Sequence, residues 1–265
     1  MFTNGYIFRF AIIMVVIVGA LLTAAAKLLE PRQDANVRIE KIQDMLAAAG
    51  IENTKADAED LYNSHIIREA LVDFDGNELV SLTPDQLESA PSTDRAFNVD
   101  MKVLTKQIDE FKGGISKESP RLPLFVFRNG DDTLYIIPMR GKGLWGPIWG
   151  NFALYSDLNT VAGVSFDHKT ETPGLGAEIK LSWFEDAYSR EISTDDGPDR
   201  HKSDMTIFDK EGKLVGVLAI KGGAADDDPH GVDAISGGTI TSVAVNSMVL
   251  NYLSCYESYF NNHKK

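Results

Sequence analysis

The first fifty residues change from an unbroken apolar run to an amphipathic pattern. No charged side chain occurs between Phe10 and Ala26, and as a helix this run would be roughly 26 Å long, close to a hydrocarbon core of ~30 Å. We therefore predict a membrane anchor over residues 1–30. A cleaved signal peptide is the alternative, because the alanines at 24–26 suit a cleavage site, but the run exceeds a usual signal core of about 7–15 residues.

Beyond the anchor, apolar positions recur at helical spacing between Val37 and Ala49, and Gly50 follows as a stop signal. Residues 51–115 are polar and interrupted by turn residues, so we expect short helices and strands there that pad the fold or dock onto it. Residues 31–120 as a whole are predicted to form the N-terminal part of a domain outside the membrane.

From Leu122 onward the pattern becomes that of β-strands joined by hairpins. Leu122–Phe127 and Thr133–Met139 flank the turn signal Asn129-Gly130 and predict one hairpin. We expect further strands and a second hairpin in the segments that follow: Asn151–Ser156, Thr160–Asp167, and Met205–Phe208 paired with Leu214–Ile220.

The last predicted element is a helix from about Ser242 to Phe260. One face of it repeats apolar residues at a period near 3.6: Val245, Val249, Tyr252, Leu253, Tyr256 and Phe260. Hairpins mixed with helices predict an α+β fold, in which an N-terminal transmembrane helix precedes a mixed, mainly antiparallel sheet with flanking helices. Residues 121–265 are predicted to form its main domain.

Charge and cysteine content exclude several classes of function. The formal net charge is −13, and residues 1–26 contribute one positive charge to it, so an acidic body of about −14 follows the anchor. Such a body would be repelled by phosphate backbones, which argues against nucleic-acid binding. Cys255 is the single cysteine, so neither an internal disulfide nor a cysteine-ligated cluster is expected. The acidic run 226–228 with His230 is interpreted as a solvated loop rather than a metal site.

Three glycine-rich segments are the candidates for chemistry. Asp233–Ser242 precedes the last predicted helix, whose N-terminus is a natural seat for a phosphate. Thr170–Glu178 is a Pro-Gly loop with hydroxyls and a carboxylate, and Gly141–Gly150 carries two tryptophans that suit stacking on a planar ligand. Each segment alone also has a purely structural interpretation. The first could be a glycine-rich turn before a helix capped by Thr241 or Ser242, the second a structural turn, and the third a loop whose two tryptophans belong to the core.

Together, the three segments resemble those of a known family. The stretch from Asp233 to Thr239 is similar to Asp-x-x-Ser-Gly-x-Thr, the recognition sequence of a flavin transferase that moves FMN from FAD onto the threonine. With Thr-Glu-Thr-Pro-Gly-Leu-Gly at 170–176, Gly-Leu-Trp-Gly at 143–146 and the anchor, the chain resembles the C subunit of the Na⁺-translocating NADH:quinone oxidoreductase. The resemblance is strongest over 120–250, and it departs at Gly238, where the family usually has alanine.

The resemblance implies that residues 121–265 are an FMN-binding domain and that FMN is bound covalently, as a phosphoester on Thr239. Thr241 is the competing hydroxyl, but Thr239 is the one that completes the sequence. Asp233 and Ser236 would belong to the transferase's recognition sequence. The other residues that the resemblance places near the flavin are Leu144, Trp145, Glu171, Thr172, Leu175, Ser236, Gly237 and Gly238.

The resemblance also implies an electron-transfer component of a complex of six subunits that passes electrons from NADH towards ubiquinone and exports Na⁺. The chain would cross the bacterial inner membrane once, with its soluble domain on the periplasmic side. A partner subunit would oxidise NADH, because no GxGxxG loop follows a predicted strand here. Two alternatives stay open: the G-type subunit of the homologous ion-pumping ferredoxin:NAD oxidoreductase, and an anchored scaffold without a redox role.

Overall fold

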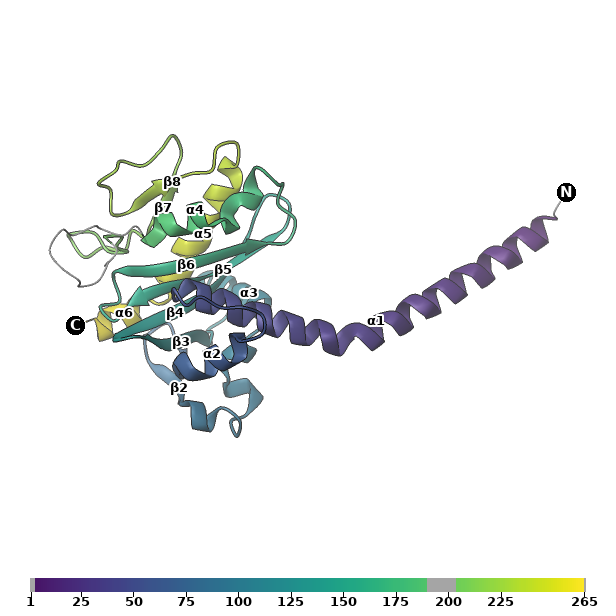
Figure 1. The fold of residues 1–265 in the computed structure, drawn as a ribbon, viewed down its shortest axis with the longest axis horizontal. Helices are drawn as coiled ribbons and strands as arrows, with labels where there is room; N and C mark the ends of the chain where they lie inside the picture. The colour runs from purple at the N-terminus through teal and green to yellow at the C-terminus, as the bar shows by residue number, and fades with distance from the viewer. Residues whose placement is uncertain (1–2, 190–203, 265) are drawn as a thin grey trace. The chain divides into compact units, whose positions relative to one another are not determined.

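The computed structural model describes residues 3–189 and 204–264. The chain divides into two compact units, residues 1–42 and residues 43–265. The first unit belongs to helix α1 (Asn4–Ala48), which starts the ribbon in Figure 1. Within the described part of the chain, α1 is the one helix long and apolar enough to span a membrane. The predicted amphipathic helix up to Ala49 is the continuation of this same helix, and it ends before Gly50, which takes a left-handed φ of 67°.

The second unit is built on a six-stranded antiparallel sheet in the order β2-β1-β3-β4-β5-β6. Its strands are β1 (Ile66–Val72), β2 (Glu78–Leu82), β3 (Leu122–Asn129), β4 (Asp132–Lys142), β5 (Pro147–Tyr155) and β6 (Val161–His168). The hairpin predicted around Asn129-Gly130 is β3–β4, with Asn129 opposite Asp132. Because β1 and β2 extend this sheet, the predicted boundary between 120 and 121 falls inside it.

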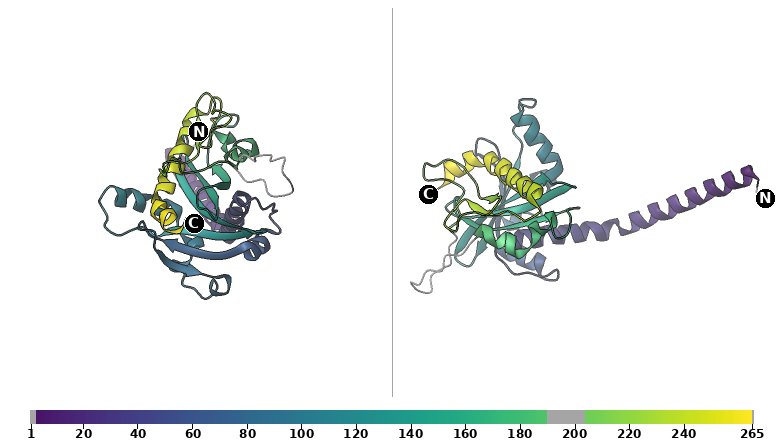
Figure 2. Two further views of the ribbon diagram at one scale, coloured as in Figure 1. Left: turned by 90° about the vertical axis from the view of Figure 1, so that its left-hand side faces the viewer. Right: turned by 90° about the horizontal axis from the view of Figure 1, so that it is seen from above.

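Both faces of the sheet are covered, which explains why β3 is buried along most of its length. One face packs under α3 (Met101–Lys112) and α5 (Thr239–Cys255), and Figure 2 shows α5 lying across the strands. On the other face lie α2 (Ala58–His65) and the last turn of α1; the ring of Tyr62 in α2 stands edge-on to Phe127, with centroids 5.4 Å apart. The predicted α+β class is confirmed.

The last predicted helix is two helices, α5 and α6 (Glu257–His263), separated by Tyr256. All six residues of its predicted apolar face are buried, so the periodicity identified the correct face: Val245, Val249, Tyr252, Leu253, Tyr256 and Phe260. α5 begins three residues earlier than predicted, at Thr239, because Gly238 takes the N-cap position.

The second predicted hairpin forms only around its turn, where the Asp209 N–H donates to the Lys213 carbonyl at 3.0 Å and the Val215 N–H donates to the Ile207 carbonyl at 2.8 Å. Within the described residues, Phe208 and Leu214 form an isolated antiparallel bridge, and no longer ladder follows it. Instead, β7 (Leu218–Ile220) pairs in parallel with β8 (Gly231–Asp233). Short helical segments surround the sheet: η1 (Pro84–Gln86), η2 (Ser92–Asp94), η3 (Ala96–Asn98), η4 (Gly176–Lys180), and α4 (Ser182–Glu185), which runs into η5 (Asp186–Ser189).

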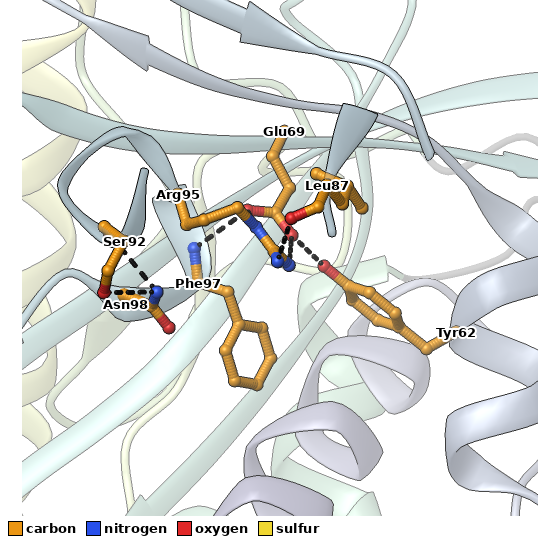
Figure 3. A network of polar contacts seen from close by, with 7 residues as sticks. All are labelled: Tyr62, Glu69, Leu87, Ser92, Arg95, Phe97 and Asn98. Carbon is orange, nitrogen blue, oxygen red and sulfur yellow. Dashed lines mark hydrogen bonds and ion pairs between the residues drawn. The ribbon is translucent and has the colours of Figure 1, made fainter. Parts of the chain in front are cut away.

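A buried ion pair holds the segment with η1, η2 and η3 against the sheet (Figure 3). Glu69 on β1 is fully buried and accepts hydrogen bonds from Tyr62 (3.0 Å), from the Arg95 guanidinium (2.7 Å) and from the Phe97 N–H (3.1 Å). Arg95 also donates to the Leu87 carbonyl at 2.8 Å. The charge is therefore compensated on several sides, as a buried carboxylate requires.

Candidate functional site

The site is centred on the start of α5. Gly237 has a φ of 74°, a left-handed conformation that favours glycine, and the turn closes with a hydrogen bond from the Gly238 N–H to the Ile235 carbonyl at 3.0 Å. The Ser242 hydroxyl accepts from the Ile235 N–H (3.1 Å) and donates to the Gly238 carbonyl (3.2 Å). Among the described residues no side chain caps α5, so the N–H groups of its first turn remain available for an anion.

Glu171 ties the three glycine-rich segments together. Its side chain is buried, with 4% of the residue exposed. One carboxylate oxygen, Oε1, accepts from the Trp145 N–H at 2.9 Å, and Oε2 accepts from the Thr241 hydroxyl at 2.8 Å. The loop between β4 and β5, the Pro-Gly loop and the first turn of α5 thus meet at one carboxylate.

Glycines allow these segments to approach so closely. A Cβ on Gly143 would lie 2.5 Å from Glu171 Oε1 and 2.9 Å from Ile148 Cγ2. A Cβ on Gly176 would collide with the Thr241 hydroxyl and lie 2.7 Å from Glu171 Oε2. Packing around Glu171 therefore explains one glycine in each loop, Gly143 and Gly176.

The three segments enclose a pocket of about 290 Å³. Its apolar side chains are unusually exposed: Trp145 at 66%, Ile240 at 60% and Leu144 at 47%. An open apolar pocket of this kind suits a planar aromatic ligand. The lining residues come from all three walls: Leu144, Trp145, Glu171, Thr172, Leu175, Gly176, Gly237, Gly238, Thr239, Ile240 and Thr241.

The pocket gathers every site residue that the sequence suggested except Ser236. Ser236 is exposed outside the lining, as is Asp233, whose carboxylate accepts from the Ala224 N–H at 2.8 Å. Sequence reasoning missed Gly176 and Ile240 as lining residues. Ile240 could have been found, because it stands between Thr239 and Thr241 at the start of a helix.

The two threonines of α5 have different surroundings. Thr239 is half-buried in the pocket wall, and within the described part of the chain its side chain makes no hydrogen bond. Thr241 is 2% exposed, and its hydroxyl proton is donated to Glu171. Of the two hydroxyls, that of Thr239 is the more accessible to chemistry.

His168 supports the site from the end of β6. Its Nδ1 accepts a hydrogen bond from the Glu171 N–H at 3.2 Å, which places the proton of a neutral imidazole on Nε2. Nε2 is buried and has no partner among the residues that the structure describes. His168 does not line the pocket, so its contact positions the backbone of Glu171.

The pocket fits the parts of FMN. Trp145, Leu144 and Leu175 present apolar surface for a flat ring, and the uncapped α5 N-terminus presents N–H groups for a phosphate. Residues 143–254 match the family model described as an FMN-binding domain, a range that contains all three walls. The fold and the pocket therefore define a flavoprotein domain that binds FMN.

Curated relatives narrow the class further. The chain is 30% identical over 246 residues to the C subunit of the Na⁺-translocating NADH-quinone reductase of Vibrio parahaemolyticus, and the match covers 92% of this chain and 86% of that protein. The corresponding protein of Haemophilus ducreyi is 29% identical over 243 residues, with 89% and 84% covered. This chain belongs to the family of C subunits of the Na⁺-translocating NADH-quinone reductase, an oxidoreductase complex. The predicted family is confirmed.

Solved structures agree with this assignment. The crystal structure of the family member from Parabacteroides distasonis is 30% identical and superposes with a TM-score of 0.68, covering 88% of this chain and 96% of that one. The NqrC structure from Shewanella oneidensis, at 23% identity, shares the fold with a TM-score of 0.61 over 86% of this chain and 97% of that one.

Proposed function

We propose that this chain carries FMN as a phosphoester on Thr239 and passes electrons from NADH towards ubiquinone in a sodium-exporting complex. The observation that supports the attachment point most directly is the contrast between the two threonines of α5. Thr239 stands in the pocket wall without a hydrogen bond among the described residues, whereas the Thr241 hydroxyl is buried against Glu171.

Each wall of the pocket has a role in this proposal. The first-turn N–H groups of α5 stabilise the phosphoryl charge, because they carry the positive end of the helix dipole. Leu144, Trp145 and Leu175 contact the ring, and Thr172 offers a hydroxyl to its polar edge. Glu171 braces the walls through the two hydrogen bonds described above. FMN, when bound, supplies the redox chemistry, and the chain supplies position and surroundings.

The attachment requires a flavin transferase as a maturation partner. In that reaction the Thr239 oxygen replaces AMP at the FMN phosphorus of FAD, and the hydroxyl proton leaves with the departing AMP. Asp233 and Ser236 are both exposed beside Thr239, so an enzyme can read them on the folded surface. A covalent tether keeps the cofactor at high effective concentration where free FMN is scarce.

The apolar part of α1 would anchor the chain once in the bacterial inner membrane, with the domain on the periplasmic side. The other members of a complex of six subunits would surround it, and one of them would oxidise NADH. No acidic residue lies in the apolar run of α1, so we do not assign Na⁺ movement to this helix alone.

Peptide mapping of protein produced together with the transferase tests the proposal. We expect one FMN adduct on the peptide that contains Thr239, and loss of that adduct in Thr239→Ala. Thr241→Ser is the matched control, because serine keeps the hydroxyl that Glu171 accepts from, and it should retain the adduct. An adduct that persists in Thr239→Ala, or an unmodified wild-type peptide beside an active transferase, would refute it.

A further inference from the structure

A cluster of positive charge lies on this acidic protein. Lys102 and Lys106 of α3 and Arg140 and Lys142 of β4 line a depression of about 510 Å³, with α5 as its third side; we call it the cationic depression. The formal net charge of the chain is −13, so four cations around one hollow are a marked local reversal. Among the described residues, Asp109 is the one acidic side chain in the lining.

The three lysines of the cationic depression are exposed and can interact with a binding partner. Lys106 pairs with Glu110 at 3.4 Å, but 78% of its side chain is exposed, and such surface pairs bind weakly. Lys102 and Lys142 are also exposed, and no ion pair involves either within the described residues. Long, exposed lysine side chains suit the charged rim of a protein interface better than a buried site for a small anion.

The cationic depression lies next to the flavin pocket along two elements. Ile240 lines the flavin pocket, and Ala244 and Ser247 line the depression, at the i, i+4 and i+7 spacing of one helix face. On the neighbouring strand, Lys142 ends β4, and the chain runs on within two residues to Leu144 of the flavin pocket. The two hollows are therefore parts of one continuous surface.

Exposed apolar side chains line the flavin pocket, and Val243 continues them along α5. Leu144, Trp145, Ile240 and Val243 are each about half exposed or more, from 47% to 66%. A group of large apolar side chains with charges beside it is the pattern of a protein–protein interface, in which an apolar centre excludes water and a charged rim guides the approach.

We propose that this surface is the docking face for the protein subunit that exchanges electrons with this chain, and that the docking subunit presents acidic residues to the cationic depression. The inference rests on the proposed electron-carrier function. The remainder of this chain is acidic and repels an acidic partner, so the four cations direct that partner to the cationic depression beside the flavin pocket.

The test uses the full chain in its native membrane. The variant Lys102→Glu/Lys106→Glu/Lys142→Glu reverses three rim charges, and Lys117→Glu/Lys210→Glu/Lys213→Glu is the control, with the same charge change at exposed lysines outside the depression. Three readouts are compared: flavin adduct by mass, recovery of the other subunits with the tagged chain, and the rate of NADH-dependent quinone reduction as salt is raised.

We expect the depression variant to keep its flavin adduct while the reduction rate at low salt falls at least about fivefold, with co-purification weakened and salt dependence flattened. The control should stay within about twofold of wild type. Equal behaviour of the two variants would overturn the docking face. Loss of the adduct from wild-type protein would instead refute the proposed function, so the two failures are distinguishable.

A photo-crosslinker at Ser247, inside the depression, identifies what covers it. Ser247 is exposed, and its hydroxyl bonds only the Val243 carbonyl of its own helix among the described residues. Crosslinks to another protein subunit would support the proposal. Crosslinks to lipid alone, or to a small anion-carrying molecule alone, would overturn it.

Discussion

The hydroxyl of Thr241 and the carboxylate of Glu171 are 70 positions apart in the chain and 2.8 Å apart in the fold. This hydrogen bond joins α5 to the Pro-Gly loop, and the other oxygen of Glu171 joins that loop to Trp145. The buried carboxylate of Glu171 thus holds the pocket walls together. Removing one of its hydrogen-bond donors would cost free energy, because water cannot reach the buried carboxylate to take the donor's place.

Removing the Thr241 hydroxyl should therefore destabilise the domain. In Thr241→Val, Glu171 loses a side-chain donor while the volume stays nearly constant, so we expect the free energy of unfolding to fall by about 1–3 kcal/mol. Thr239→Val makes the same chemical change at a half-buried hydroxyl that bonds none of the described residues, and it should cost less than about 0.5 kcal/mol. Urea unfolding of both variants without flavin checks this, and equal losses would contradict the brace.

The glycine at 238 should be replaceable at a modest cost. A Cβ there would lie 2.8 Å from Ile235 Cγ2, so Ile235 must move, and alanine is also a poorer N-cap than glycine. We expect Gly238→Ala to lower the free energy of unfolding by about 1–2 kcal/mol and still to accept the flavin adduct. Unfolding curves and adduct mass measure the two effects. Full loss of the adduct would mean that the methyl group blocks modification itself.

Breaking the buried ion pair of β1 should have the largest effect on stability. Arg95→Leu leaves the fully buried Glu69 without its cation, and we expect a loss of about 3–5 kcal/mol. In Glu69→Met/Arg95→Leu no uncompensated charge remains, so the double variant should be more stable than the single one. Thermal or urea unfolding tests the order, and a single variant within about 1 kcal/mol of wild type would contradict it.

The contribution of Glu185 to the free energy of unfolding should fall as pH rises towards neutrality. The pKa of Glu185 is raised from its ordinary 4.5 to about 7, chiefly because the carboxyl group is buried, and the nearby Asp186 and Asp167 add to this rise. A hydrogen bond of 2.6 Å from the Phe166 N–H favours the charged form and limits the rise. Between about pH 4.5 and pH 7, the folded state therefore binds the proton of Glu185 more tightly than the unfolded state does. The contribution of Glu185 is full below about pH 4.5 and lost as pH passes about 7, a change of roughly 1–3 kcal/mol.

Glu185→Gln isolates this effect, since glutamine cannot ionise. The free energy of unfolding of wild type and variant should differ by an amount that changes between pH 5 and pH 7, with the variant gaining relative stability as pH rises. Parallel stability curves over that interval would show that Glu185 titrates normally.

The sequence pattern predicted the parts of the fold that depend on the conformational preferences of a few neighbouring residues. The turn at Asn129-Gly130 fixes the β3–β4 hairpin, and Gly50 ends α1 because it can take positive φ. The pairing of Leu218–Ile220 could not be predicted in this way. Its alternation indicates a strand, but the partner Gly231–Asp233 is a short, glycine-containing segment that carries no strand pattern of its own.

The lining of the pocket was largely predictable from the sequence, whereas the contacts that its residues make were not. The family resemblance pointed to Leu144, Trp145 and Thr239, which line one pocket. Nothing in the sequence distinguishes a carboxylate that faces a ligand from one that braces loops, so the two hydrogen bonds of Glu171 emerge only from the fold. The helix start was misplaced because a glycine, and not a hydroxyl side chain, takes the N-cap.

The three pocket walls leave the ribosome in the order 143–146, 170–176 and 237–241, and the last of them also carries Thr239. A nascent chain therefore has no pocket until α5 has emerged and packed on β4. A chain whose α5 has not yet docked presents Thr239 without the two loops that complete the pocket. The pocket is thus complete only in a chain whose α5 has been synthesised and has docked on the sheet.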